Sequence, residues 1–177
     1  MYTPQFSSGT SLQMGSGAEA KFDKIAKMAR IYSKKASINE ERLHIDRIID
    51  YKGKMIPIEI KAMKKISRSD PAPQDRYIWI ELHGVHPNDK GWLYGGHAEF
   101  IAFEIKNGFM FVKRTDLINL VNRLVDFKSV ATTPQEALNK VYARRAQTSG
   151  IFGEGSDLVT LIDAKKIEAI SLMTWKV

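Results

Sequence analysis

Residues 43–63 read LHIDRIIDYKGKMIPIEIKAM, and this stretch decides how the rest of the chain is arranged. Two runs of alternating apolar residues flank Lys52 and Gly53, and period-two alternation on both sides of a turn predicts a β-hairpin. If Lys52 and Gly53 are the two central turn residues, Tyr51 lies opposite Lys54. Every other opposed pair of the hairpin then follows by counting away from the turn.

The counting places Asp46 opposite Glu59 and His44 opposite Lys61. Because side chains alternate across a strand, one face of the hairpin carries polar residues and the other carries nearly all the isoleucines. The polar face comprises His44, Asp46, Ile48, Asp50, Met55, Pro57, Glu59, Lys61 and Met63. We expect the isoleucine face to pack in the core and the polar face to form a functional site.

The opposed carboxylates of Asp46 and Glu59 are the chemically informative pair. Like charges directly opposite each other on a sheet destabilise it by roughly 0.2–1 kcal/mol. A divalent cation held by both groups would offset the repulsion, and Mg²⁺ prefers oxygen ligands of this kind. Asp50 is a rival for the aspartate position, but the register places it opposite Met55, nearer the turn.

These residues resemble a known motif. Asp46, followed on the next strand by Glu59-Ile60-Lys61, is similar to the motif of the PD-(D/E)xK nuclease superfamily, with Ile45 where the motif has proline. The separation of 13 positions between the two acids resembles that of the Holliday-junction-resolvase branch. The stretches WIEL (79–82) and GWLYG (91–95) also resemble phage-encoded nucleases.

The resemblance implies a restriction-endonuclease-like α/β core, with a central mixed β-sheet flanked by helices. It implies a metal-dependent DNA endonuclease that hydrolyses phosphodiester bonds, including those of branched DNA, and a homodimer that cuts two strands. The metal would be Mg²⁺, with Mn²⁺ as a substitute, held by Asp46, Glu59 and the backbone carbonyl of Ile60. Lys61 would orient or help to deprotonate the attacking water, which makes Asp46, Glu59 and Lys61 the expected catalytic residues.

Glu19 is a further candidate on the first predicted helix. By resemblance it matches a glutamate that helps to hold the metal or its water, and so counts as both a catalytic and a metal-binding candidate. The alternative is a capping role, because Glu19 follows Ser16 at the spacing of a capping box. The two roles do not exclude each other.

Net charge and composition bear on the partner. The 177-residue chain has a net charge of +7, which suits a polyanion, and it contains no cysteine, which excludes disulfides, thiolate zinc sites and cysteine nucleophiles. No apolar run approaches the roughly 18 residues that span a bilayer, so we expect no membrane association and a cytoplasmic location, in a host cell if the protein is phage-encoded.

Residues beyond the hairpin are candidates for contacts with DNA. We expect Lys64, Lys65 and Arg68 to contact phosphates, Gln74 to approach the substrate from a long loop, and His44 to border the site. Alternatively, Lys64, Lys65 and Arg68 belong to an ordinary solvent-exposed surface that binds no substrate.

Two other functions fit the same residues. The first is a non-catalytic nucleic-acid-binding module on the same fold, and the second is an interaction protein whose hairpin acids pair with lysines of a partner. The second predicts no dependence on metal.

Along the chain we expect an N-terminal arm over residues 1–17 and a single domain over residues 18–177. Further predictions are a hairpin with Asn107-Gly108 as its turn, a helix capped by Thr115, and a second helix from Thr133 to about Ala146. Strands are predicted at 77–82 and 158–162, and a short helix and a final apolar stretch follow the second of them.

Overall fold

The computed structural model describes residues 8–86, 88–145 and 156–176 and shows a mixed α/β fold. The helices are α1 (Ser8–Met28), α2 (Ile38–Glu41), α3 (Gly91–Gly95), α4 (Arg114–Leu124) and α5 (Ala164–Glu168), with a 3₁₀ turn, η1, at Pro134–Glu136. The strands are β1 (Ser33–Lys35), β2 (Arg47–Tyr51), β3 (Lys54–Lys61), β4 (Tyr77–His83), β5 (Phe100–Ile105), β6 (Gly108–Lys113), β7 (Asp126–Ala131), β8 (Lys140–Arg145), β9 (Ser156–Asp163) and β10 (Met173–Lys176).

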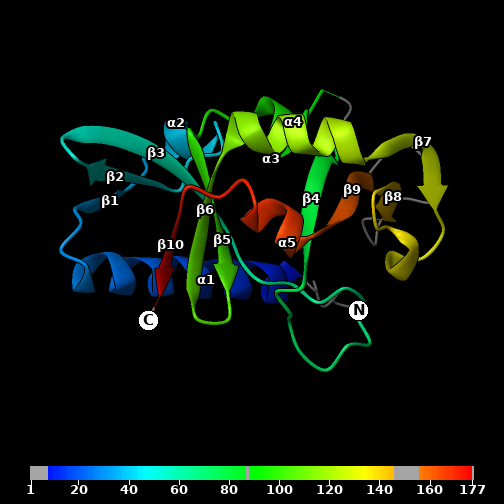
Figure 1. Ribbon diagram of the computed structural model, residues 1–177, viewed down its shortest axis with the longest axis horizontal. Coiled ribbons are helices and arrows are strands. Elements are labelled where there is room, and N and C mark those ends of the chain that lie inside the picture. Colours follow the sequence, from blue (N-terminus) through cyan, green and yellow to red (C-terminus); the bar gives the residue numbers. More distant parts are fainter. Residues whose placement is uncertain (1–7, 87, 146–155, 177) are drawn as a thin grey trace, which may run out of the picture.

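The strands form two sheets (Figure 1). A six-stranded mixed sheet has the order β1-β2-β3-β5-β6-β10, and a four-stranded sheet has the order β4-β9-β8-β7. In the six-stranded sheet β3 and β5 are parallel, and the chain between them passes through β4 and α3. That crossover brings the second sheet against one end of the first.

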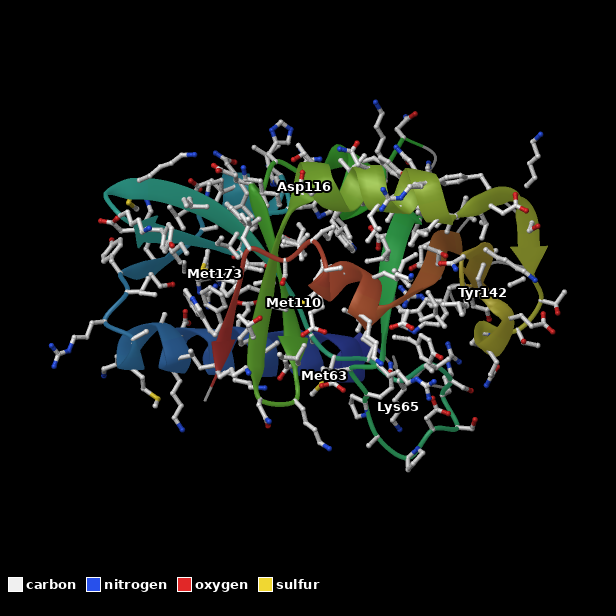
Figure 2. The ribbon with its side chains drawn as sticks, in the orientation of Figure 1. Met63, Lys65, Met110, Asp116, Tyr142 and Met173 are labelled. Carbon is white, nitrogen blue, oxygen red and sulfur yellow. The ribbon has the colours of Figure 1, made fainter. Side chains whose placement is uncertain are left out.

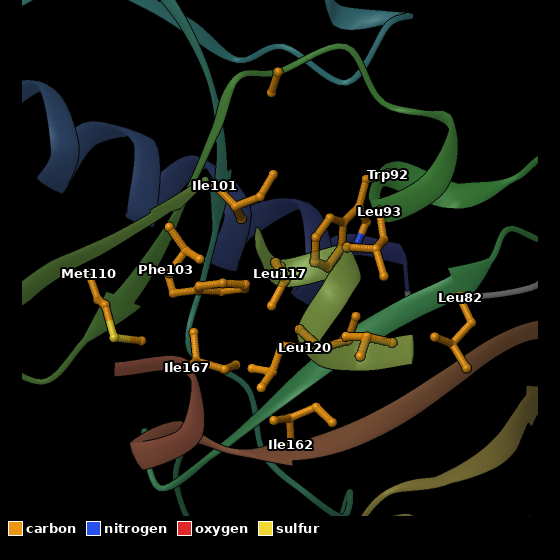
Figure 3. Packing of buried hydrophobic residues seen from close by; sticks show 14 of the residues in the cluster. Leu82, Trp92, Leu93, Ile101, Phe103, Met110, Leu117, Leu120, Ile162 and Ile167 are labelled. Atoms are coloured by element: carbon orange, nitrogen blue, oxygen red, sulfur yellow. The ribbon is translucent and has the colours of Figure 1, made fainter. Parts of the chain in front are cut away.

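Helices cover both faces of the six-stranded sheet. On one face, α1 contributes Phe22 and Ile25 to a cluster with the isoleucines of β2 and β3. On the other face, Ile101 and Phe103 of β5 pack with residues of α3, α4 and α5 (Figure 3). The expectation of a central mixed sheet flanked by helices is confirmed, whereas the second sheet was not predicted.

The predicted hairpin register is confirmed where β2 and β3 pair. Tyr51 lies opposite Lys54, and the ladder continues in the same register to Arg47 opposite Ile58. The prediction is wrong beyond that pair, because the chain from 43 to 46 is not strand. The short helix α2 ends at Glu41, and His44 then takes a positive φ of 57°, which turns the chain before β2 begins.

Two predicted helix boundaries are wrong. Helix α1 begins at Ser8, so half of the predicted arm is helical and Ser16 lies inside the helix rather than at its cap. Once a helix is nucleated, each added residue gains a hydrogen bond, which lets it run into a sequence of weak helix formers. Helix α4 begins at Arg114 with Lys113 at its N-cap, so Thr115 is not the cap. Residues 1–7 of the predicted arm lie outside the described residues.

The predicted helix from Thr133 to Ala146 is also wrong. Only the 3₁₀ turn η1 forms there, and the chain then enters β8, which pairs with β7 on one side and β9 on the other. Tyr142 of β8 packs against Trp79 of β4 with ring centroids 6.0 Å apart. Pairing on both edges and aromatic packing override the local capping signal.

The second hairpin turns one residue earlier than predicted. Ile105 pairs with Gly108, so the turn residues are Lys106 and Asn107. Gly108 has a φ of 145°, and a Cβ added there would lie 1.8 Å from the carbonyl oxygen of Trp175. Only glycine therefore allows β10 to pair along β6 at this position.

Replacing Gly108 tests this packing. We expect Gly108→Ala to lower the free energy of unfolding by about 3 kcal/mol or more, because both the backbone strain and the clash with Trp175 oppose folding. Gly53→Ala is the matched control, since Gly53 also has a positive φ of 80° but has open space around its Cβ position. That variant should lose only about 1–2 kcal/mol in urea titration. Equal losses of unfolding free energy in the two variants would show that the contact with β10 does not restrict the side chain at position 108.

Candidate active site

Asp46 sits where the ladder between β2 and β3 ends, and its backbone is fixed on both sides. Its amide donates to the carbonyl of Ile58 at 2.8 Å, and its carbonyl accepts from the amide of Ala36 at 3.0 Å. Its side chain takes over the next ladder position, because Oδ2 accepts from the amide of Ile60 at 2.6 Å. The carboxylate is thereby held along the edge of β3, beside Glu59.

Glu59 is buried on β3, with 5% of its surface exposed. Its Oε1 pairs with Nζ of Lys61, two residues along the same strand and therefore on the same face. Nζ of Lys61 also lies 4.9 Å from the ring centroid of Trp92, which is buried on α3. The structure thus brings Asp46, Glu59 and Lys61 together, as the sequence predicts.

The surroundings of Asp46 disfavour its charged form. Burial, followed by the charge of Glu59, raises the pKa of Asp46 to about 6. The Ile60 amide and Lys61 act in the opposite direction, and a hydrogen bond with the Glu59 side chain makes the smallest contribution. Above pH 6 Asp46 therefore carries a charge that its burial and Glu59 oppose, and a nearby cation would stabilise that charge.

The backbone carbonyl of Ile60 points toward the same place. A strand residue directs its amide and its carbonyl to the same edge, and the Ile60 amide is directed at Asp46. Two carboxylates and one carbonyl form a set of hard oxygen donors that suits Mg²⁺, which usually keeps several waters. Within the described ranges, no three His, Asp or Glu side chains are arranged to hold a metal ion, so the protein ligands of this site would number few.

Glu19 is placed differently from the other predicted residues. Arg47 lies on the face of the sheet that packs against α1, where its Nη1 contacts Oε2 of Glu19 at 2.9 Å and its Nη2 contacts Oδ2 of Asp23 at 2.8 Å. The same Nη1 donates to the carbonyl of Asp46 at 2.9 Å. The Arg47 guanidinium thus links Glu19 to the backbone carbonyl of Asp46, rather than to the carboxylates of Asp46 and Glu59. The role of Glu19 in metal binding stays a prediction. Its predicted capping role is wrong, since it lies well inside α1.

His44 borders the site. Burial and the positive charge of Lys61 lower the pKa of His44, while Glu81, Asp89 and Asp46 act against that shift. His44 lies in the turn before β2, and its imidazole is close enough to Lys61 and Asp46 for their charges to act on it, although the predicted strand pairing with Lys61 does not form. A neutral imidazole near Lys61 is the form that these surroundings favour.

The predicted nucleic-acid-binding residues divide into two kinds. Lys64 is partly buried in a cleft beside Lys61, and Arg68 is exposed. Gln74 is tied to backbone: its Nε2 donates to the carbonyls of Lys64 and Tyr77, and its Oε1 accepts from the Tyr77 amide. The carbonyl of Lys65 accepts from Nε1 of Trp79 at 2.9 Å. Gln74 and the Lys65 backbone therefore fix the loop after β3.

Sequence reasoning missed Glu81 and Arg144. Both line the cleft beside Lys61, Glu81 from β4 and Arg144 from β8. Oε1 of Glu81 accepts from the amide of Trp92 at 3.2 Å and so fixes the start of α3. The WIEL stretch contains Glu81 but carries no sign of which sheet it joins, and Arg144 fell within the predicted helix that does not form.

No protein-family model, no curated protein and no solved structure matches the chain. The resemblance to PD-(D/E)xK nucleases therefore depends on the motif residues alone. Among the described residues no helix has the length and apolar character to cross a membrane.

The raised pKa of Asp46 predicts how stability varies with pH. Between about pH 4 and 6 the folded protein holds a proton on Asp46 that the unfolded chain has lost, so stability falls as pH rises and stays lowered above pH 6. Asp46→Asn keeps an oxygen for the Ile60 amide and removes the charge. We expect it to raise the metal-free unfolding free energy by roughly 1–3 kcal/mol at pH 8 and to have little effect at pH 4.

Urea titrations in EDTA across this pH range measure the difference. Asp50→Asn is the matched control on β2, because Asp50 is exposed and its Oδ1 accepts from the Gly53 amide at 2.8 Å, a bond that asparagine keeps. Parallel pH profiles for the wild type and Asp46→Asn would contradict the raised pKa.

Proposed function

We propose that this chain is a metal-dependent nuclease of the PD-(D/E)xK type that hydrolyses phosphodiester bonds in DNA. The observation that carries the proposal is the placement of Asp46 beside Glu59 where the β2–β3 ladder ends, with Lys61 paired to Glu59. The motif order in the sequence and this geometry agree independently. The restriction-endonuclease-like core is part of the same proposal, supported by the mixed sheet with α1 on one face and the acid pair on the other.

The carboxylates of Asp46 and Glu59 and the carbonyl of Ile60 would hold the metal ion, Mg²⁺ or in its place Mn²⁺. When bound, the ion supplies Lewis-acid polarisation of the phosphate and a lowered pKa for a coordinated water. Burial, and then the charge of Glu59, raises the pKa of Asp46, and a bound divalent cation would offset both effects.

Lys61 is the residue that would act on the water and the phosphate. Its ammonium lies at the Glu59 carboxylate, where it donates hydrogen bonds and stabilises negative charge that develops during hydrolysis. The Trp92 ring beside it shields one side from solvent and keeps the ammonium near the acids. His44 borders the same region. Burial and the charge of Lys61 lower its pKa and so favour the uncharged imidazole.

DNA is the proposed substrate because the chain carries a net charge of +7 and a basic segment directly after the catalytic lysine. Branched DNA as the preferred structure, and a homodimer that cuts two strands, are parts of the proposal supported only by the resemblance to resolvases.

Cleavage assays test the proposal directly. Supercoiled plasmid and a synthetic four-way junction are incubated with the protein in Mg²⁺, Mn²⁺ or EDTA. We expect metal-dependent cutting by the wild type and at least about a 100-fold loss of rate in Asp46→Ala, Glu59→Gln and Lys61→Met. The control Asp50→Asn should cut at nearly the rate of the wild type.

Circular dichroism and thermal melting show whether each variant is folded. The proposal fails if the wild type cuts neither DNA in Mg²⁺ or Mn²⁺, or if cutting persists undiminished in folded Asp46→Ala. Equal binding of DNA in EDTA without any cutting would favour the non-catalytic binding module.

Metal binding has a readout that does not depend on cleavage. At pH 8 we expect millimolar Mg²⁺ or Mn²⁺ to raise the melting temperature of the wild type, because a ligand that binds only the folded state stabilises it. The shift should disappear in Asp46→Asn and Glu59→Gln but persist in Asp50→Asn. An equal shift in all four proteins would place the metal elsewhere.

A further inference from the structure

A cleft adjoins the acid pair on the side of Lys61 and lies between the two sheets. Its volume is about 30 Å³, and it opens to solvent. Lys61 and Lys64 contribute to it from the end of β3 and the segment after it, whereas Glu81 of β4 and Arg144 of β8 contribute from the second sheet. Met63 and Tyr142, labelled in Figure 2, mark these two parts of the chain.

Three cations converge in this cleft. Burial, then the charges of Arg144 and Lys61, lowers the pKa of Lys64 to about 8. Glu81 and Asp157 act in the opposite direction, with smaller effect. In the described part of the chain, no carboxylate lies within ion-pair distance of Lys64, although ion pairs are formed by Lys61 and Arg144. The ammonium of Lys64 is thus held near two other positive charges, without an ion pair to any described carboxylate.

Arg144 is oriented for an anion. Its Nε donates to Oδ1 of Asp157 at 3.1 Å and its Nη2 pairs with Oδ2 of the same residue, which is buried. This two-point contact fixes the guanidinium plane, and 42% of the side-chain surface remains exposed. A guanidinium has five donors, so others remain for a second acceptor.

We propose that Lys64 and Arg144 form a phosphate subsite, which binds a phosphate group of the substrate strand next to the one that is cut. The proposal rests on the proposed nuclease function for its position relative to the scissile bond, but the binding itself does not require cleavage. The second sheet then forms one side of the nucleic-acid site.

A phosphate group fits these residues for three reasons. It offers several acceptor oxygens, which suit a fixed guanidinium on one side and an ammonium on the other. Its negative charge removes the repulsion among Lys61, Lys64 and Arg144. The partly exposed aromatic residues Tyr77 and Trp79, which also line the cleft, present apolar surface beside it for the attached nucleoside.

DNA binding by charge-removing variants tests the subsite. The probe is a 3′-fluorescein-labelled 20-nucleotide DNA, single-stranded or duplex, with either a 5′-hydroxyl or a 5′-phosphate, titrated in EDTA by fluorescence anisotropy. We expect Lys64→Met and Arg144→Met each to weaken binding about tenfold and to reduce the slope of log K against log salt by about 0.7–0.9. Lys64→Arg, which keeps the charge, should restore most of the affinity.

The control is Lys128→Met, which removes an exposed charge from β7 that does not line the cleft. Its affinity should stay within about twofold of the wild type.

Losses of affinity that are equal for the 5′-hydroxyl and the 5′-phosphate DNA indicate an internal phosphodiester in the subsite. A loss of affinity confined to the 5′-phosphorylated DNA indicates a terminal phosphate. Both outcomes support the proposal. Folded Lys64→Met and Arg144→Met that bind like Lys128→Met overturn it.

The two proposals fail separately. If the wild type cuts DNA, Asp46→Ala does not, and Lys64→Met and Arg144→Met weaken binding, both stand. If the wild type cuts nothing but Lys64→Met and Arg144→Met weaken binding, the nuclease fails and the subsite remains as a binding site. If Asp46→Ala abolishes cutting while Lys64→Met and Arg144→Met bind normally, the nuclease stands and the subsite fails.

Discussion

The hydrogen bond from the Ile60 amide to the Asp46 carboxylate determines the geometry of the candidate site. It forms where β2 has ended, so a side-chain oxygen takes the place that a backbone carbonyl would occupy in a longer ladder. This contact holds a charged group along the edge of a buried strand, beside the Glu59 carboxylate. Ionising Asp46 in this position costs free energy, because burial and the charge of Glu59 raise its pKa. Such a shift is common at functional sites.

The alternation of side chains across the sheet separates the neighbouring residues Asp46 and Arg47. Arg47 lies on the face that α1 covers, where Glu19 and Asp23 neutralise it. Asp46 lies near the opposite face, with Glu59, Lys61 and the buried Trp92. One guanidinium spans the two environments, because it also donates to the Asp46 carbonyl. Helix α1 thus supports the position of Asp46 from behind the sheet, which is a positioning effect rather than a shared carboxylate cluster.

The second sheet extends the basic character of the site. Residues after β3 run from Lys61 into a loop fixed by Gln74 and Trp79, and these contacts join the loop to β4. Lysines from the first sheet and an arginine from the second therefore share one cleft. Asp75, Glu81 and Glu104 also line the cleft, so its three cations lie among three carboxylates.

The sequence by itself determined the hairpin, its register from Tyr51 to Arg47 and the grouping of Asp46, Glu59 and Lys61, because these follow from short-range alternation around one turn. It also determined β9, and it identified the final apolar stretch without predicting that β10 forms there. Tertiary structure alone decided the second sheet and the strand at 140–145, which depends on pairing with both β7 and β9. It also decided the turn at Lys106-Asn107, because Gly108 pairs with Lys176 of β10. The local sequence pattern likewise did not predict the ion pair between Glu19 and Arg47 or the shared cleft of Lys64 and Arg144. Both depend on which elements pack together, and neither local capping nor periodicity carries that information.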